Sequence, residues 1–349
     1  LRMYPEGYTV VNVVDLESYV KGVIPSEVPS SYGMEALKAQ AVCARSYAYI
    51  QMMHNKYEAY GAHVDDSVNF QVYNKQNQTP ETVAAVDETK GQVLSYKGDI
   101  IETYYYSTSY GHTGDYEAWN LDKDAYGYLQ GVWVRSEENP IDLSDEKSFL
   151  DYISNVDSAC YESDLKYFRW NTVLDFQGKD ETLLHTIADR KEHQPEAISY
   201  YKDASKTETT DSCSNFGSLQ AIKVVKRNQS GVILELELDF QNGAVSVQSE
   251  YNMRAILGCG ITNINLLDGS SVEMSILPSA YISIQAKGDG TYAVLGGGYG
   301  HGIGMSQNGA QKLCGQGFDY KRILNYFYQD TELTELYQPQ NMTKEEGGA

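Results

Sequence analysis

Basic residues are scarce in this chain. Its 349 residues include 27 lysines and arginines against 48 aspartates and glutamates, so the formal net charge is −21. An acidic surface repels polyanions, and no basic patch offsets it, so we expect no nucleic-acid partner. Long apolar runs are also lacking. No stretch approaches the ~20 apolar residues of a transmembrane helix, and the first residues do not follow the pattern of a signal peptide.

Cysteine is rare and scattered. The five cysteines form no C-x-x-C motif and no Cys/His cluster, which argues against a zinc ribbon and against a dense disulfide framework. A single disulfide, for example between Cys160 and Cys213, stays open. The remaining composition is that of a globular protein, with one excess: 30 tyrosines against 8 phenylalanines. Tyrosine offers a flat apolar face and a hydroxyl, which suits sugar stacking as well as ordinary half-buried strands.

The most informative stretch runs from Ile24 to Gln51. Pro25 and Pro29 each fix their own φ and disfavour helix in the residue before them, so we expect Glu27 on a stiff, non-helical elbow. A helix is predicted next, because Met34 to Met53 contains no proline or glycine and alanine recurs throughout. Ser30 or Ser31 is the expected cap.

Apolar residues surround most of this predicted helix, which indicates burial. The exceptions are Lys38 and Arg45, which are seven residues apart and therefore share one face. A buried helix with one cationic stripe, entered through an elbow that holds a carboxylate, fits the floor of an active site. A core helix with a solvated edge and a surface glutamate fits the same pattern.

Two later stretches combine glycine with groups that bind or react. In the first, Ser107 and Ser109 leave a predicted strand end and meet Gly111 and His112. Such loops are common binding sites but are also ordinary turns.

The second, residues 296–310, is rich in glycine, which permits positive φ and close backbone approach to a ligand. Its spacing fits neither G-x-G-x-x-G nor a Walker A motif, which argues against nucleotide binding. Around Ser306 it is a near miss of the G-x-S-x-G nucleophile elbow. His301 lies between glycines, so we expect it to face a cleft.

Three motifs in this order carry a family resemblance. PSEVPSSYGMEALKAQAVCARSYAY, YYSTSYGHTGDYEAW and GGGYGHGIGMSQNGA resemble the stage II sporulation protein D family, which includes the amidase-enhancer proteins. The resemblance covers about residues 10–330 and is loose over 135–215. It implies a lytic transglycosylase that acts on peptidoglycan glycan strands outside the cytoplasm, either secreted or membrane-anchored.

The resemblance also implies site residues. Glu27 matches the family's catalytic glutamate, and the matched substrate-binding positions are Lys38, Arg45, Ser107, Ser109, Gly111, His301, Ser306 and Gln307. One usual glycine of the family is Tyr110 here. Sporulation members also carry a Cys/His cluster that binds zinc in some of them. The corresponding stretch here has His63, Asp66, Asn69 and Phe70 but no cysteine, so we expect no metal and no other cofactor.

The implied mechanism needs a single carboxyl group. Glu27 would give its proton to the oxygen between MurNAc and GlcNAc and then, as carboxylate, take the proton of the C6 hydroxyl, which closes onto C1 as a 1,6-anhydro end. We expect Lys38 and Arg45 to face the substrate rather than Glu27.

Two other functions remain open. One is a non-catalytic, wall-binding enhancer of a partner amidase. The other is a Ser306/His301 hydrolase, for which we can place no third, orienting acid.

The pattern of elements predicts an α+β fold, with antiparallel sheets packed on the Ala-rich helix and two lobes around a groove. We expect 1–135 and 255–340 to form a catalytic lobe, 136–254 to be inserted as the second lobe, and 341–349 to be a disordered tail.

Overall fold

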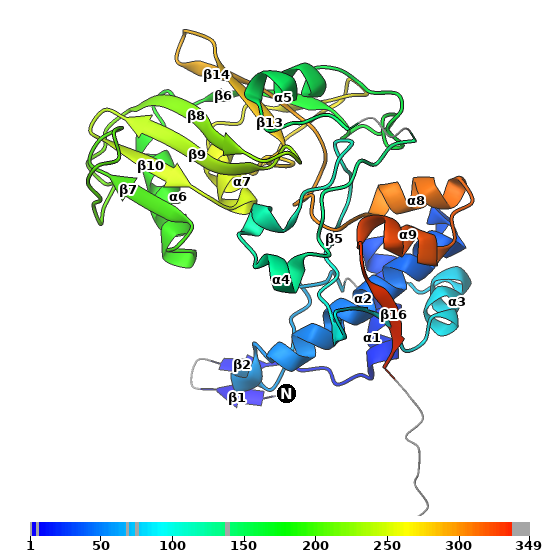
Figure 1. The fold of residues 1–349 in the computed structure, drawn as a ribbon. Helices are drawn as coiled ribbons and strands as arrows, with labels where there is room; N and C mark the ends of the chain where they lie inside the picture. Colours follow the sequence, from blue (N-terminus) through cyan, green and yellow to red (C-terminus); the bar gives the residue numbers. More distant parts are fainter. Residues whose placement is uncertain (1, 5–6, 68–69, 74–76, 137–139, 337–349) are drawn as a thin grey trace, which may run out of the picture. The chain divides into compact units, whose positions relative to one another are not determined.

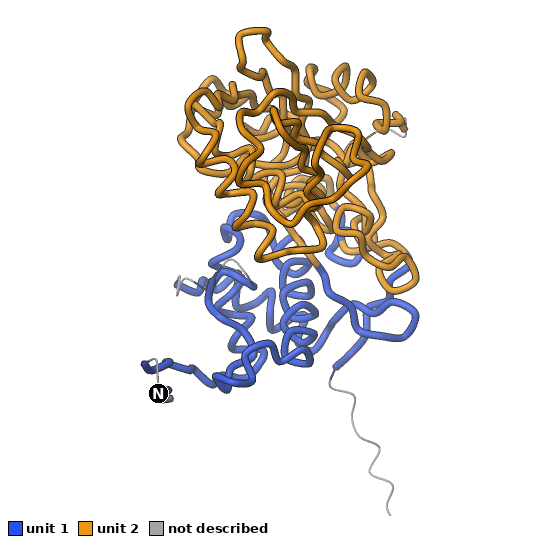
Figure 2. The backbone as a smooth tube through the Cα atoms, turned by 90° about the vertical axis from the view of Figure 1, so that its left-hand side faces the viewer, with its two compact units in different colours: residues 1–103, 318–323, 330–349 blue, residues 104–317, 324–329 orange. Residues whose placement is uncertain are grey.

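The structure, a computed structural model, describes residues 2–4, 7–67, 70–73, 77–136 and 140–336. The predicted tail therefore lies outside the described residues. The chain divides into two compact units, which Figure 1 shows as a ribbon and Figure 2 in two colours. Unit 1 consists of Leu1–Thr103, Phe318–Ile323 and Asp330–Ala349, and unit 2 of Tyr104–Gly317 and Leu324–Gln329.

Unit 1 is built around its longest helix, α2 (Met34–His54). Helices α1 (Leu16–Glu27) and α3 (Pro80–Glu88) and strand β3 (Gln92–Tyr96) pack on it. Small side chains such as Ala41 and Ala44 are fully buried there, and they allow the helices to approach closely. The predicted Ala-rich, buried helix is confirmed.

The remaining elements of unit 1 are short. Strand β3 pairs with β4 and β16 in an antiparallel sheet, and the turn between β3 and β4 has Lys97 and Gly98 at positive φ. Helix α9 begins in this unit. The elements are β1 (Arg2–Tyr4), β2 (Gly7–Thr9), η1 (Ser30–Tyr32), η2 (Glu58–Tyr60), β4 (Asp99–Ile100), α9 (Tyr320–Phe327) and β16 (Glu332–Glu335).

The predicted elbow is wrong in one respect: Glu27 is the last residue of α1, and Pro25 lies inside that helix. A proline in the last turn removes only one helical hydrogen bond, so the helix continues to Glu27. Val28, which precedes Pro29, does leave the helix, with φ −138° and ψ 143°. The predicted caps are also wrong, because Gly33 precedes α2 while Ser30 begins η1.

Unit 2 contains two antiparallel sheets. One has the strand order β7-β10-β9-β8 and the other β12-β11-β6-β14-β13. Helices α6 and α7 and both sheets contribute to one hydrophobic core. The strands are β6 (Trp170–Asp175), β7 (Ile198–Tyr201), β8 (Leu219–Arg227), β9 (Ile233–Phe240), β10 (Gly243–Val247), β11 (Ile264–Leu266), β12 (Ser271–Val272), β13 (Ile282–Ala286) and β14 (Thr291–Gly296).

The other elements of unit 2 flank these sheets. A pair of parallel strands, β5 and β15, joins two segments that are far apart in the sequence. The elements are β5 (Tyr105–Tyr106), η3 (Tyr116–Trp119), α4 (Lys123–Tyr126), α5 (Glu146–Ile153), α6 (Asp180–His193), α7 (Glu250–Gly258), β15 (Met305–Ser306) and α8 (Gln307–Gly315).

The α+β class with several antiparallel sheets is confirmed. The two units, however, are divided at other residues than the sequence predicts. Strand β6, from the predicted insert 136–254, lies between β11 and β14, which belong to the predicted segment 255–340. The hydrogen bonds of one sheet therefore join both segments within unit 2. The expected groove between lobes stays a prediction. All five cysteines are free.

Candidate functional site

Glu27 lies at the C-terminal end of α1, where its side chain is half-buried. Its Oε1 accepts a hydrogen bond of 2.9 Å from the backbone N–H of Val72, which fixes the carboxyl group. Two tyrosines lie close enough to feel its charge. Burial, followed by the charges of Glu102, Asp65 and Glu27, raises the pKa of Tyr47 to about 12. Burial also raises the pKa of Tyr19, so both hydroxyls are neutral near neutral pH.

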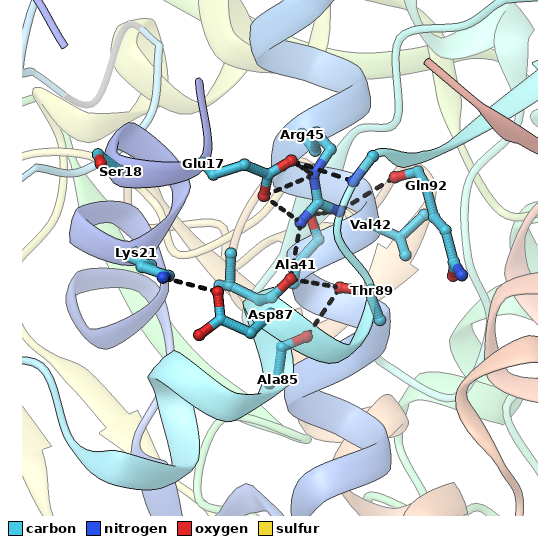
Figure 3. A network of polar contacts seen from close by, with 12 residues as sticks. Glu17, Ser18, Lys21, Ala41, Val42, Arg45, Ala85, Asp87, Thr89 and Gln92 are labelled. Atoms are coloured by element: carbon cyan, nitrogen blue, oxygen red, sulfur yellow. Dashed lines mark hydrogen bonds and ion pairs between the residues drawn. The ribbon is translucent and has the colours of Figure 1, made fainter. Parts of the chain in front are cut away.

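Arg45 pairs with Glu17 of α1 rather than with Glu27 (Figure 3). Its Nη2 lies 2.8 Å from Glu17 Oε2 and its Nε lies 3.0 Å from Glu17 Oε1. The remaining donors reach the carbonyl oxygens of Gln92, at 3.0 Å, and Val86, at 3.2 Å. The Arg45 side chain is 0% exposed. Because its partners belong to α1, α3 and β3, it holds these elements together with α2. This environment argues against the substrate contact expected for Arg45.

Lys38 lies on the same helix and is also paired. Its Nζ is 3.0 Å from Glu35 Oε1 and 2.8 Å from Glu88 Oε2, and its side chain is 15% exposed. The hydrogen bond that the Lys38 ammonium donates to the Glu88 carboxylate is the main cause that raises the pKa of Lys38. The substrate contact expected for Lys38 stays a prediction.

The two glycine-containing motifs meet in unit 2. The parallel pair of β5 and β15 places Tyr106 opposite Ser306. Next to it, Thr108 and Tyr299 exchange backbone hydrogen bonds of 3.1 and 2.8 Å. The amide of Asn308 also donates to the Ser107 carbonyl at 3.0 Å. The loops that carry the predicted residues 107–111 and 301–307 are therefore side by side.

A buried carboxyl group that the sequence analysis missed joins these loops. Glu162 is 0% exposed and accepts hydrogen bonds from the backbone N–H of Ser109 at 3.0 Å and from Ser306 Oγ at 2.8 Å. The Ser109 hydroxyl donates to its other oxygen. Burial raises the pKa of Glu162 to about 7. No motif marks Glu162, since it lies in an acidic segment where many carboxylates are exposed.

His301 is locked as a neutral imidazole. Its Nδ1 accepts from the Ile303 N–H at 3.1 Å, so Nε2 carries the proton and donates to the Tyr105 carbonyl at 2.9 Å. Burial lowers the pKa of His301 to about 4. Ser306 Oγ, in turn, caps α8 by accepting from Gly309 N–H at 3.1 Å. A Ser–His hydrolase requires a hydrogen bond between the serine hydroxyl and the imidazole. Here Ser306 and His301 each bond to other groups instead.

Gly111 has a structural reason to be glycine. Its φ is +110°, and a Cβ at this position would lie 2.1 Å from the Tyr152 hydroxyl. The adjacent Tyr110, which stands where the family has a glycine, is fully buried and stacks on Tyr281 with centroids 4.5 Å apart. The structure places Ser107 half-buried on the same loop, and the buried Gln307 begins α8. The roles of these residues in substrate binding stay predictions.

Among the residues that the structure describes, no group of three or more His, Cys, Asp or Glu side chains has the arrangement to hold a metal ion. Of the positions matched to the family's zinc region, His63, Asp66 and Phe70 are described, whereas Asn69 lies outside the described residues. Nor does any helix in the described ranges combine the length and the apolar composition needed to cross a bilayer.

Comparisons with known proteins identify relatives of both units. A family model described as "Stage II sporulation protein" matches residues 4–96, and a domain of unknown function (DUF8618) matches residues 112–304. The amidase enhancer of Bacillus subtilis is 29% identical over 90% of this chain and 40% of its own length. Stage II sporulation protein D of the same organism is 26% identical over 96% of this chain and 79% of its own.

The family model and these relatives together support the stage II sporulation protein D and amidase-enhancer family for this chain. An uncharacterized protein of Brachyspira hyodysenteriae is also similar, at 27% identity over 95% of this chain and 70% of that relative. The chain spans less than half of the amidase enhancer. The first family match falls within unit 1 and includes Glu27, and the match to the domain of unknown function falls within unit 2 and includes Glu162 and His301.

Proposed function

We propose that this protein remodels the bacterial cell wall as a peptidoglycan lytic transglycosylase, with Glu27 as the general acid and base. The observation that carries the proposal is the fixed carboxyl group of Glu27 at the end of α1, on a family motif, with its Oε1 hydrogen-bonded to Val72. A lytic transglycosylase needs one carboxyl group, whereas most glycosidases that hydrolyse need two.

In the proposed reaction the Val72 amide occupies Oε1, so the acidic proton of Glu27 is on Oε2. Glu27 donates this proton to the oxygen that bridges MurNAc and GlcNAc, and the bond from that oxygen to C1 breaks. The resulting carboxylate takes the proton from the C6 hydroxyl of the same MurNAc, whose oxygen bonds to C1. The acid is regenerated, and the product is a 1,6-anhydro end.

The charged residues of α2 have a supporting role in this proposal. Arg45 holds the start of α1 through Glu17, and Lys38 ties α2 to α3 through Glu88. They keep in place the helix that carries Glu27. In unit 2, we assign glycan contact to the half-buried Ser107 and to the loop backbone, while Ser109 and Ser306 shape the loops through Glu162.

The experiment compares Glu27→Gln with the parent on purified peptidoglycan and analyses the products by mass spectrometry. We expect the parent to release fragments that end in 1,6-anhydroMurNAc and the variant to release none. Glu58→Gln is a matched control, because Glu58 is an exposed glutamate of unit 1 and the chemical change is the same. Anhydro ends at the parental rate from Glu27→Gln would refute the proposal.

A second candidate function is a wall-binding enhancer of a partner amidase that breaks no bond itself. The relative named amidase enhancer, similar over 90% of this chain, favours it. Under this function the parent itself produces no anhydro ends but accelerates amidase cleavage of the same peptidoglycan. Either function places the protein outside the cytoplasm, against the cell wall.

A further inference from the structure

Unit 2 contains a cavity of about 930 Å³, and its lining includes Trp119 but none of the residues 107–111 or 301–307 of the loops joined by Glu162. Its walls come from η3, from the connection between α6 and β7, from the first residues of β9, and from the start of α7. Pockets for small molecules have volumes of roughly 300–1,000 Å³, so this one has room for a ligand of several rings.

Aromatic side chains from separate segments line the cavity. Trp119 and Tyr104 are in an edge-to-face contact with centroids 4.8 Å apart, and the Trp119 ring is also 5.1 Å from the His301 ring. Tyr251, on α7, is 47% exposed. Aromatic side chains that line a polar cavity are suited to the apolar faces of sugar rings, while their polar edges and neighbours form hydrogen bonds.

The wall that carries Trp119 is held in place by polar contacts of the Asp115 carboxylate. The Asp115 carboxylate accepts from the Glu117 N–H at 3.0 Å at the start of η3. It also accepts from Asn228 Nδ2 at 2.9 Å and from Ser230 Oγ at 2.8 Å, both in the turn between β8 and β9. Because these contacts exist without a ligand, Trp119 loses little freedom when it stacks on one.

The charges of the cavity are nearly balanced. Two of its glutamates are paired within the protein: Glu235 with Lys206 at 2.7 Å, and Glu250 with Arg254 at 3.0 Å. The others, Glu117 and Glu196, are exposed, as is the single lysine of the lining, Lys226. A lining with a small excess of carboxylates disfavours phosphates and other anions. It favours an uncharged ligand that can accept and donate hydrogen bonds.

We propose that this cavity binds an uncharged oligosaccharide of N-acetylated sugars, stacked on Trp119 and Tyr251. The site lies within the part of the chain matched to a domain of unknown function, and that domain is therefore assigned a glycan-binding role. The inference rests on the proposed function for its substrate class, a wall glycan, but it does not require Glu27, which belongs to unit 1.

The test measures the binding of penta-N-acetylchitopentaose to the full chain by isothermal titration calorimetry. This probe contains no MurNAc, so cleavage by the proposed reaction does not interfere. We expect saturable binding, weakened about tenfold or more by Trp119→Ala and by Tyr251→Ala, where tenfold corresponds to about 1.4 kcal/mol. Tyr8→Ala is the matched control, since Tyr8 is 72% exposed and lies in unit 1.

Three outcomes would overturn the inference. The first is that the probe does not bind. The second is that neither Trp119→Ala nor Tyr251→Ala weakens its binding. The third is that the cationic pentaglucosamine binds and the N-acetylated probe does not. If Trp119→Ala does not fold, Tyr251→Ala decides, because Tyr251 is exposed. Glu27→Gln separates the two proposals: it should keep probe binding while it loses anhydro products. If Glu27→Gln loses cleavage and the parent does not bind the probe, the glycan-binding cavity is refuted and the proposed cleavage reaction is not.

Discussion

Glu162 makes the stability of unit 2 depend on pH, and Glu162→Gln should remove that dependence. Burial raises the pKa of this carboxyl group from 4.5 to about 7 in the folded protein. Between these pH values the folded state keeps a proton that the unfolded state has lost, so the free energy of unfolding falls as pH rises. From pH 5 to pH 8 the loss from this group is roughly 2.5 kcal/mol.

The substitution suits the site because one amide oxygen can still accept from the Ser109 N–H and from Ser306 Oγ. The amide NH₂ then faces the Ser109 hydroxyl, which can rotate to accept. Because glutamine does not titrate, the variant should lose the part of the pH dependence that Glu162 supplies.

The assay is urea unfolding followed by tryptophan fluorescence at pH 5 and pH 8. All three tryptophans, Trp119, Trp133 and Trp170, belong to unit 2, so the signal reports this unit. Asp164→Asn is the control, since this carboxylate is two residues away and its side chain is 66% exposed. Parallel pH dependences for the parent and Glu162→Gln would refute the reasoning.

Three further predictions concern other residues. Arg45→Ala leaves the Glu17 carboxylate, which is 12% exposed, without its charged partner and should lower the free energy of unfolding of unit 1 by about 3–5 kcal/mol, measured by circular dichroism in urea; a loss below 1 kcal/mol would contradict the structural role. Gly111→Ala should lower the free energy of unfolding of unit 2, because its Cβ would lie 2.1 Å from the Tyr152 hydroxyl and its φ of +110° disfavours a side chain; a parental free energy of unfolding, measured by tryptophan fluorescence in urea, would contradict that contact. Because the pKa of His301 is lowered to about 4, the rate of glycan cleavage should show no inflection from His301 between pH 5 and pH 8, and His301→Asn should leave the shape of the pH profile unchanged.

Local sequence signals predicted the parts of the fold that depend on local physics. Helix α2 was predicted to within one residue at its C-terminal end, because the uninterrupted run from Met34 is rich in good helix formers. The turn of the hairpin at Asn228–Gly231 and the short helix α7 likewise depend on nearby residues. These elements need no knowledge of distant residues.

The errors come from contacts between residues far apart in the sequence. The partner of Arg45 is Glu17, 28 positions earlier, and nothing in the helical spacing of α2 indicates it. The pairing of β6 with β14 unites segments that composition alone had separated. Glu162 joins Ser109 and Ser306 from an acidic stretch that carries no motif. Pro25 is an error of another kind. Its proline was expected to end the helix, but α1 continues through it to Glu27.

The most direct test of the central claim is the yield of 1,6-anhydroMurNAc ends from purified glycan strands, measured by mass spectrometry for the parent and for Glu27→Gln at equal folded concentration. We predict anhydro ends from the parent and none above background from the variant. Equal yields from the two proteins, or no anhydro ends from the parent, would contradict it.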